Sequence, residues 1–135
     1  MLSKKTKYAF KALMFLSKSP ENQPVLIATI AKETRISKKF LENILLDLKK
    51  AGFLNSKMGK GGGYFLAKSP QLIKMAQIIR IFSGPIALLP CVSLNYYESC
   101  SDCEDEETCK LRDAMIAVRD ESLKILEGKT LADLC

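Results

Sequence analysis

The sequence contains no histidine and no tryptophan, and it lacks any long uncharged run free of helix breakers. Without histidine, a zinc site of mixed cysteine and histidine ligands is excluded, and so is a catalytic histidine base. The longest uncharged run, residues 81–97, contains Gly84, Pro85 and Pro90 and cannot form a membrane-spanning helix. Four lysines within the first eleven residues interrupt any apolar stretch of the kind that a secretory signal needs. We therefore expect a cytoplasmic protein with no membrane partner.

The chain has five cysteines in 135 residues, an odd number that cannot all pair within the chain. In a reducing compartment such cysteines are more often free thiols or metal ligands than a disulfide framework. A chain of this length buries enough apolar surface to fold without disulfides, as one domain with at most one extension.

Charge is unevenly distributed along the chain, whose net charge is +6. Residues 1–70 carry 14 Lys and Arg against 4 acids, a net +10, whereas residues 71–135 carry 7 against 11, a net −4. A basic half suits a polyanion, because each neutralised phosphate releases counterions. The acidic half is expected to face solvent, protein or metal.

Three amphipathic helices are predicted in the basic half, at residues 4–17, 26–34 and 38–51. Apolar residues of the third recur at the spacing of one helix face and leave its lysines outward. Ser37 is suited to cap this helix and Gly52 to end it. Arg35 and Ile36 provide a tight turn, so the second and third helices are predicted to form a helix-turn-helix with the third in the major groove of DNA.

A basic hairpin is predicted directly after the third helix, from extended runs at 53–57 and 64–67 joined by a glycine-rich turn. Val25 and Leu26 are expected to add a small edge strand to it. Helix and hairpin together offer positively charged groups to the phosphates and grooves of a duplex. The residues predicted to contact double-stranded DNA are Lys4, Lys7, Tyr8, Ser37, Lys38, Lys39, Glu42, Asn43, Lys57, Lys60 and Gly61.

A fourth helix is predicted to begin at Pro70, with Ser69 as its cap, and to stop at Gly84 and Pro85. Its expected buried face consists of Leu72, Met75, Ala76, Ile79 and Phe82. The loop that follows, residues 85–108, is long for a small domain, and a bound metal is one reason for such a loop.

Four cysteines lie in this loop and at the start of the next helix, and they are the candidate metal ligands: Cys91, Cys100, Cys103 and Cys109. Thiolates so closely spaced can hold an iron-sulfur cluster or tetrahedral zinc. Metal-free thiols that sense oxidation are a further interpretation, and Cys135 is interpreted as a bystander.

The last helix is predicted from about Thr108 to Glu127, with Gly128 as its cap. Steps of four and three residues define an apolar seam of the two-helix coiled-coil type, made of Leu111, Met115, Val118, Ser122 and Ile125. A second apolar row contains Ile116, Leu123 and Leu126. We expect the seam to form a homodimer interface, since a dimer matches a two-fold symmetric DNA site. The alternative is that both rows pack on the helix's own domain.

The run AGFLNSKMGKGGGYFLA, at residues 51–67, resembles the wing signature of the Rrf-two family of bacterial winged-helix transcription regulators. Ser3, Lys4, Lys7, Tyr8 and Ala9 resemble the family's opening, and residues 130–134 resemble its ending, so the likeness spans nearly the whole chain. The resemblance implies a winged helix-turn-helix that binds DNA. It also implies, for some members, a two-iron or four-iron cluster held by three cysteines and a fourth ligand of another type. This chain departs from that pattern by having four cysteines and by carrying Met58 where the family's wing usually has arginine.

The predicted architecture is mainly α with a small β-hairpin: a winged helix-turn-helix domain at residues 1–84, a cysteine-bearing sensor loop at 85–108, and a dimerisation helix with a tail at 109–135. The predicted function is a DNA-binding transcriptional regulator, acting as a homodimer on a two-fold symmetric operator and controlled by an iron-sulfur cluster or by thiol redox state. The alternative is a metal-free regulator acting through a protein partner, as an interaction module. An enzyme is not expected, because the Cys100 and Cys103 pair lacks the strand-to-helix setting of a thiol oxidoreductase.

Overall fold

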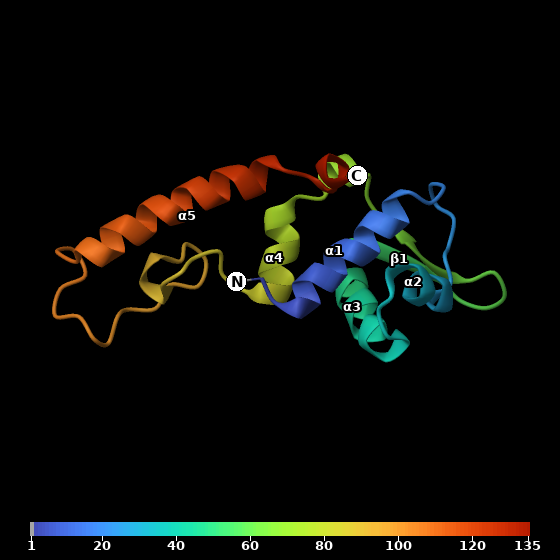
Figure 1. Cartoon of the computed structure of the whole chain (residues 1–135), viewed down its shortest axis with the longest axis horizontal. Coiled ribbons are helices and arrows are strands. Elements are labelled where there is room, and N and C mark those ends of the chain that lie inside the picture. The colour runs from blue at the N-terminus through green and yellow to red at the C-terminus, as the bar shows by residue number, and fades with distance from the viewer. Residues whose placement is uncertain (1) are drawn as a thin grey trace.

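The computed structural model describes residues 2–135 and shows a helical body from which a long C-terminal helix projects as an arm (Figure 1). In chain order, the elements within these residues are α1 (Lys4–Ser17), α2 (Ile27–Thr34), α3 (Lys38–Lys50), β1 (Leu54–Lys57), β2 (Gly63–Leu66), the 3-10 turn η1 (Pro70–Leu72), α4 (Met75–Ser83), the 3-10 turn η2 (Pro90–Val92), α5 (Lys110–Gly128) and the 3-10 turn η3 (Leu131–Leu134). The predicted class, mainly α with one small β-hairpin, is confirmed. Over residues 2–135, no helix is long and apolar enough to cross a membrane.

Helix α1 lies at the centre of the body and packs against α2, α3 and α4. Its buried face includes Leu13 and Leu16, and α3 contributes a stripe at the predicted spacing: Leu41, Ile44, Leu45 and Leu48. Burying each such side chain contributes about 1.5–3 kcal/mol. This core fixes α3 on one side, so that its opposite face remains in solvent.

The helix-turn-helix forms as predicted. Helix α2 ends at Thr34 and is followed by Arg35, whose backbone is left-handed. Helix α3 begins after Ser37, whose hydroxyl accepts a hydrogen bond from the Phe40 N–H at 3.3 Å. This bond satisfies one of the free N–H groups at the helix start. The third helix ends at Lys50, one residue before its predicted end.

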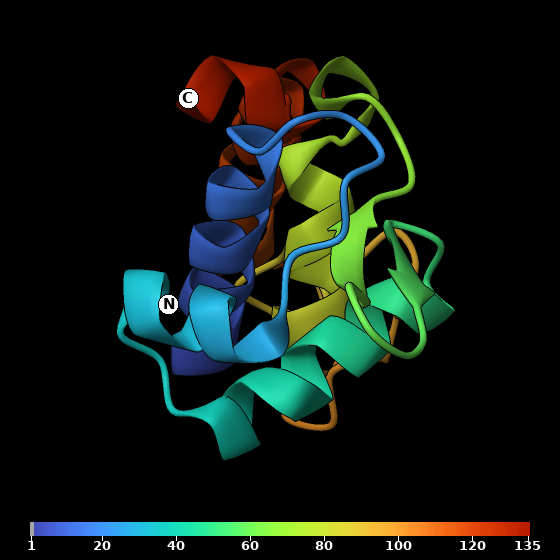
Figure 2. The same ribbon diagram turned by 90° about the vertical axis from the view of Figure 1, so that its right-hand side faces the viewer.

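Strands β1 and β2 form the predicted wing, an antiparallel hairpin in which Leu54 pairs with Leu66 and Lys57 with Gly63. Val25 adds a single bridge to Tyr64, so only part of the expected edge strand is present. Figure 2 shows the hairpin next to the C-terminal end of α3, which leads into it.

Gly63 is where the wing meets the segment before α2. Its φ of +145° is a conformation that other residues rarely adopt, and a Cβ built here would lie 2.1 Å from the Val25 carbonyl oxygen. We expect Gly63→Ala to lower the free energy of unfolding by more than about 1 kcal/mol, because both strain and overlap oppose it. Urea denaturation measures this, with Gly128→Ala as the control at an uncrowded glycine. Equal loss in the two variants would contradict the close contact.

The prediction that the fourth helix begins at Pro70 is wrong, because α4 begins at Met75. The chain makes only η1 there, and the Ser69 side chain forms no capping hydrogen bond. Ile73 is extended and buried, and its carbonyl accepts from the Leu131 N–H at 2.8 Å. Leu72, predicted to be buried, is 67% exposed. The physical reason is that the C-terminal segment returns to pair with this stretch, so the regular helix, α4, begins only at Met75.

Candidate DNA-binding surface and cysteine loop

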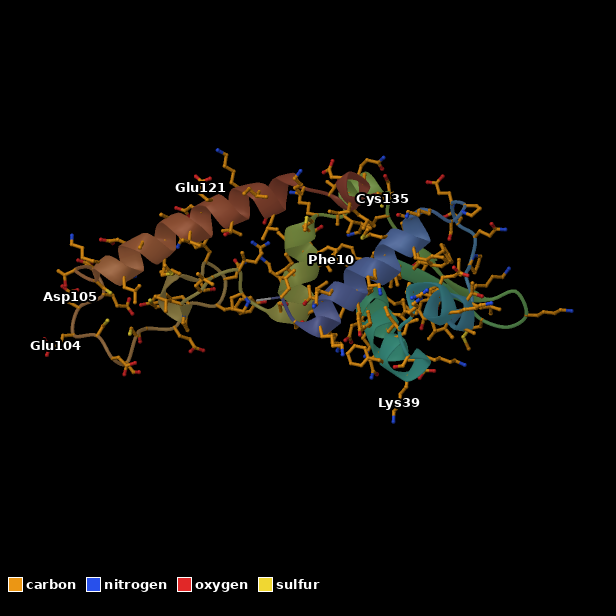
Figure 3. The ribbon with its side chains drawn as sticks, in the orientation of Figure 1. Phe10, Lys39, Glu104, Asp105, Glu121 and Cys135 are labelled. Carbon is orange, nitrogen blue, oxygen red and sulfur yellow. The ribbon has the colours of Figure 1, made fainter. Side chains whose placement is uncertain are left out.

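The exposed face of α3 carries the residues predicted to contact DNA. Ser37, Lys38, Lys39, Glu42 and Asn43 are all exposed. The labelled Lys39 side chain points away from the body (Figure 3). Because these side chains are exposed to solvent, they are available to contact phosphates and base edges.

Residues of α1 join this face at the start of α3. The rings of Tyr8 and Phe40 meet edge to face, with centroids 5.5 Å apart, and the Lys4 ammonium lies 5.7 Å from the Tyr8 ring centre. Lys7 is exposed on the same helix. Lys11 was not among the residues predicted to contact DNA, although its ammonium also lies near the Tyr8 ring, 5.8 Å from the ring centre.

The wing supplies a second exposed part. Lys57, Lys60 and Gly61 lie at the hairpin and its turn and are exposed. The predicted DNA-contacting residues therefore fall into two groups, one where α1 meets the start of α3 and one on the wing. A winged helix binds a duplex with these two parts.

Residues 85–109, hereafter the cysteine loop, place all four candidate ligands on one cavity of about 460 Å³. Cys91 is buried in η2, whereas Cys100, Cys103 and Cys109 are half-buried. Cys109 caps α5, and its sulfur accepts from the Arg112 N–H at 3.4 Å.

The thiol of Cys103 has a raised pKa. Hydrogen bonding with Cys100, followed by desolvation and the neighbouring thiol of Cys109, raises the pKa of Cys103 to about 11. In the metal-free form Cys103 is therefore protonated at neutral pH, and a metal must displace that proton.

Sequence reasoning missed Glu106, which organises the loop around the cavity. Its carboxylate accepts from the Cys100 N–H and the Tyr97 hydroxyl, both at 2.6 Å. These bonds, together with the nearby Arg112 charge, lower the pKa of Glu106, and the bond to Glu106 raises the pKa of Tyr97. A run of four acids gives no signal that distinguishes this one, because its partners are set by the folded loop.

The donor set fits a thiolate-bound iron-sulfur cluster in kind, since four soft sulfur ligands line one cavity. Within residues 2–135, however, no three cysteine, aspartate or glutamate side chains are arranged to hold a metal ion. The assignment of Cys91, Cys100, Cys103 and Cys109 as ligands stays a prediction.

Three of the five seam residues of α5 are left exposed by their own chain. Leu111, Val118 and Ile125, spaced seven residues apart, are 60%, 42% and 56% exposed. Met115 and Ser122 are half-buried. The second row behaves differently, because Ile116, Leu123 and Leu126 are half-buried and Leu126 packs against the core. The second row thus faces the chain itself, whereas Leu111, Val118 and Ile125 of the seam face solvent.

A helix-turn-helix followed by a hairpin wing defines the winged-helix class of DNA-binding folds. The chain belongs to the Rrf2 (Rrf-two) family: residues 2–135 match the family model described as an iron-dependent transcriptional regulator.

Individual relatives agree with this assignment. The chain is 40% identical to a protein of Rhodobacter capsulatus named as a putative rrf2-like transcriptional regulator, over 99% of this chain and 91% of the relative. The fold of this chain matches CymR of Bacillus subtilis, the global cysteine regulator, with a TM-score of 0.79 and 30% identity over 99% of this chain and 95% of CymR. It also matches IscR of T. potens, with a TM-score of 0.76 and 28% identity over 99% and 85%. The relatives are named as regulators, not enzymes, as the sequence predicts.

Proposed function

We propose that this chain acts as a homodimer on a two-fold symmetric operator and that the state of the cysteine loop sets its affinity for DNA. The observation that carries the proposal is the position of the loop at the start of α5. Cys109 caps the helix whose apolar seam is uncovered, so a change at the cysteines acts on the helix that is available for dimerisation. A symmetric dimer doubles the contacts and fixes the spacing of its two recognition helices.

Two sets of contacts support coupling from the loop to the DNA-binding body. Arg119 of α5 donates to the Val92 carbonyl at 2.8 Å, which ties the helix to the segment that bears Cys91. Just before the loop, Ser83 at the end of α4 contacts Thr6, and the Ser3 N–H donates to Ser83 at 3.2 Å. The end of the helix that leads into the loop therefore holds the start of α1. A few kcal/mol of differential affinity between two loop states suffices for control.

An iron-sulfur cluster, with two or four irons, is the cofactor that the four thiols support best. When bound, it supplies a redox-sensitive and oxidant-sensitive link among the loop residues. The family description as iron-dependent supports this proposal. Thiol oxidation without metal is the second candidate, favoured by the four thiols that line one cavity.

The proposal is tested by the binding of fluorescent duplex DNA, selected from random sequence, to the full chain with and without anaerobic reconstitution. We expect affinity that falls steeply with salt and that differs between the two forms. Equal affinity of both forms would remove the control by the loop. An absence of salt-dependent binding would favour the alternative, a module that acts through a protein partner.

Lys60→Ala is expected to weaken binding to all duplex sequences alike. The lysine lies at the wing turn and its charge neutralises about one phosphate, so the slope of log affinity against log salt should decrease by about 1. Lys124→Ala is the matched control, because Lys124 is an exposed lysine on α5. An unchanged slope in the Lys60 variant would count against contact between the wing and DNA.

A further inference from the structure

The turn between α2 and α3 contains an unusual backbone conformation. Arg35 has φ 57° and ψ 39°, in the left-handed region. Within residues 2–135, the only other non-glycine residue with positive φ is Asn22. Asparagine tolerates this region, whereas arginine is disfavoured there because its Cβ crowds the following carbonyl.

The fold imposes this conformation from both sides. Thr34 and Ile36 are buried, and the Thr34 hydroxyl donates to the Ile30 carbonyl at 2.6 Å. The Lys11 ammonium donates to the Thr34 carbonyl at 2.8 Å. The N–H groups of Arg35 and Ile36 both donate to the Ala31 carbonyl, which closes the helix end. A left-handed residue is required here, and glycine would provide it without strain.

The Arg35 side chain has no structural role that offsets this strain. It is exposed, and among residues 2–135 it forms no ion pair and no side-chain hydrogen bond. It stands two residues before Ser37 and three before Lys38, at the exposed start of α3. In Figure 2 the turn lies at the outer edge of the molecule, next to the first turn of α3.

We propose that Arg35 binds a DNA phosphate beside the recognition helix. The proposal rests on the proposed function and adds to it a contact outside the predicted DNA-binding set. A guanidinium donates two parallel hydrogen bonds to phosphate oxygens, which a lysine cannot reproduce. Because buried neighbours pin the backbone of the turn, the base of the side chain is already placed when DNA arrives, and less ordering is required on binding.

The test compares Arg35→Asn, Arg35→Gly and Arg35→Lys in DNA binding and in thermal unfolding. Asparagine and glycine accept the left-handed backbone and remove the charge. Both are expected to keep or raise the Tm by a few degrees while lowering affinity for duplex DNA several-fold and reducing the salt slope by about 1. Arg35→Lys keeps both the backbone strain and the positive charge. The salt slope of this variant should match that of the wild type, while its affinity for duplex DNA falls. Lys18→Ala is the control, at an exposed lysine beyond the opposite end of α1.

Lower affinity with a preserved or raised Tm supports the phosphate contact. Unchanged affinity and slope in Arg35→Asn, with normal salt-dependent binding by the wild type, overturns it and leaves the proposed function intact. A loss of affinity accompanied by a lowered Tm also overturns it, because the residue then acts through the fold. If the wild type itself binds no duplex, the proposed function fails and this contact fails with it.

Discussion

Val118→Asp is expected to leave the chain monomeric at micromolar concentration and to lower operator affinity by about 100-fold or more. Val118 lies in the middle of the apolar seam and lines a groove with Leu88 and Ser122. In a symmetric dimer the substitution would bury two carboxylates close together in an apolar interface, which is strongly unfavourable. A monomer binds only one half-site of the operator, so it loses the added affinity that a dimer gains by binding both half-sites. Analytical ultracentrifugation and DNA binding measure the two effects.

Ala117→Asp is the matched control, since it places the same carboxylate one residue away, rotated by about 100° around the helix. Ala117 is exposed and lies outside the seam. This variant should remain dimeric and bind the operator as the wild type does. A dimeric Val118→Asp protein, or a monomeric wild type, would show that the seam is not the interface.

Cys103→Ser is expected to reduce bound iron and sulfide to background after anaerobic reconstitution and to remove the visible absorption of the cluster. Cys103 lines the same cavity as Cys91, Cys100 and Cys109, so its side chain lies among the other candidate ligands. Serine keeps the size of the side chain but is a poor ligand for iron in such clusters. The loss of DNA control should accompany the loss of iron.

Cys135→Ser provides the control for this experiment. Cys135 lies against Ser17 and the Leu131 carbonyl, near the body, whereas Figure 3 places Glu104 and Asp105 of the cysteine loop at the far end of the arm. Its replacement should leave iron uptake unchanged. A wild type that takes up no iron would defeat the cluster proposal and favour thiol oxidation, and iron loss in Cys135→Ser would contradict the ligand assignment.

Local patterns predicted the helical body well. The bounds of α1 agree with the prediction and those of α3 differ by one residue, because apolar spacing and the cap at Ser37 are encoded within each segment. The wing was predictable for the same reason, from its glycines and alternating side chains. The break at Ile73 was not, because it depends on pairing with Leu131, far along the chain.

For the candidate site, the sequence predicted which residues take part but not how the fold arranges their partners. Residue type and spacing identified the exposed lysines and the four cysteines. The partners of Glu106 and the left-handed backbone of Arg35 depend on the folded loop and turn, and no local pattern in the sequence specifies them.

Backbone hydrogen bonds join the C-terminal end of helix α5 to the body. The Met75 N–H donates to the Lys129 carbonyl at 2.9 Å, and Lys74 pairs with Thr130, next to the end of the helix. The opposite end, with the cysteine loop, extends away from the body (Figure 1). A helix of this length extends about 28 Å, so a tilt of about 10° about Lys129 would displace its opposite end by about 5 Å. Such a tilt would link a small change near Lys129 to a large displacement of the cysteines.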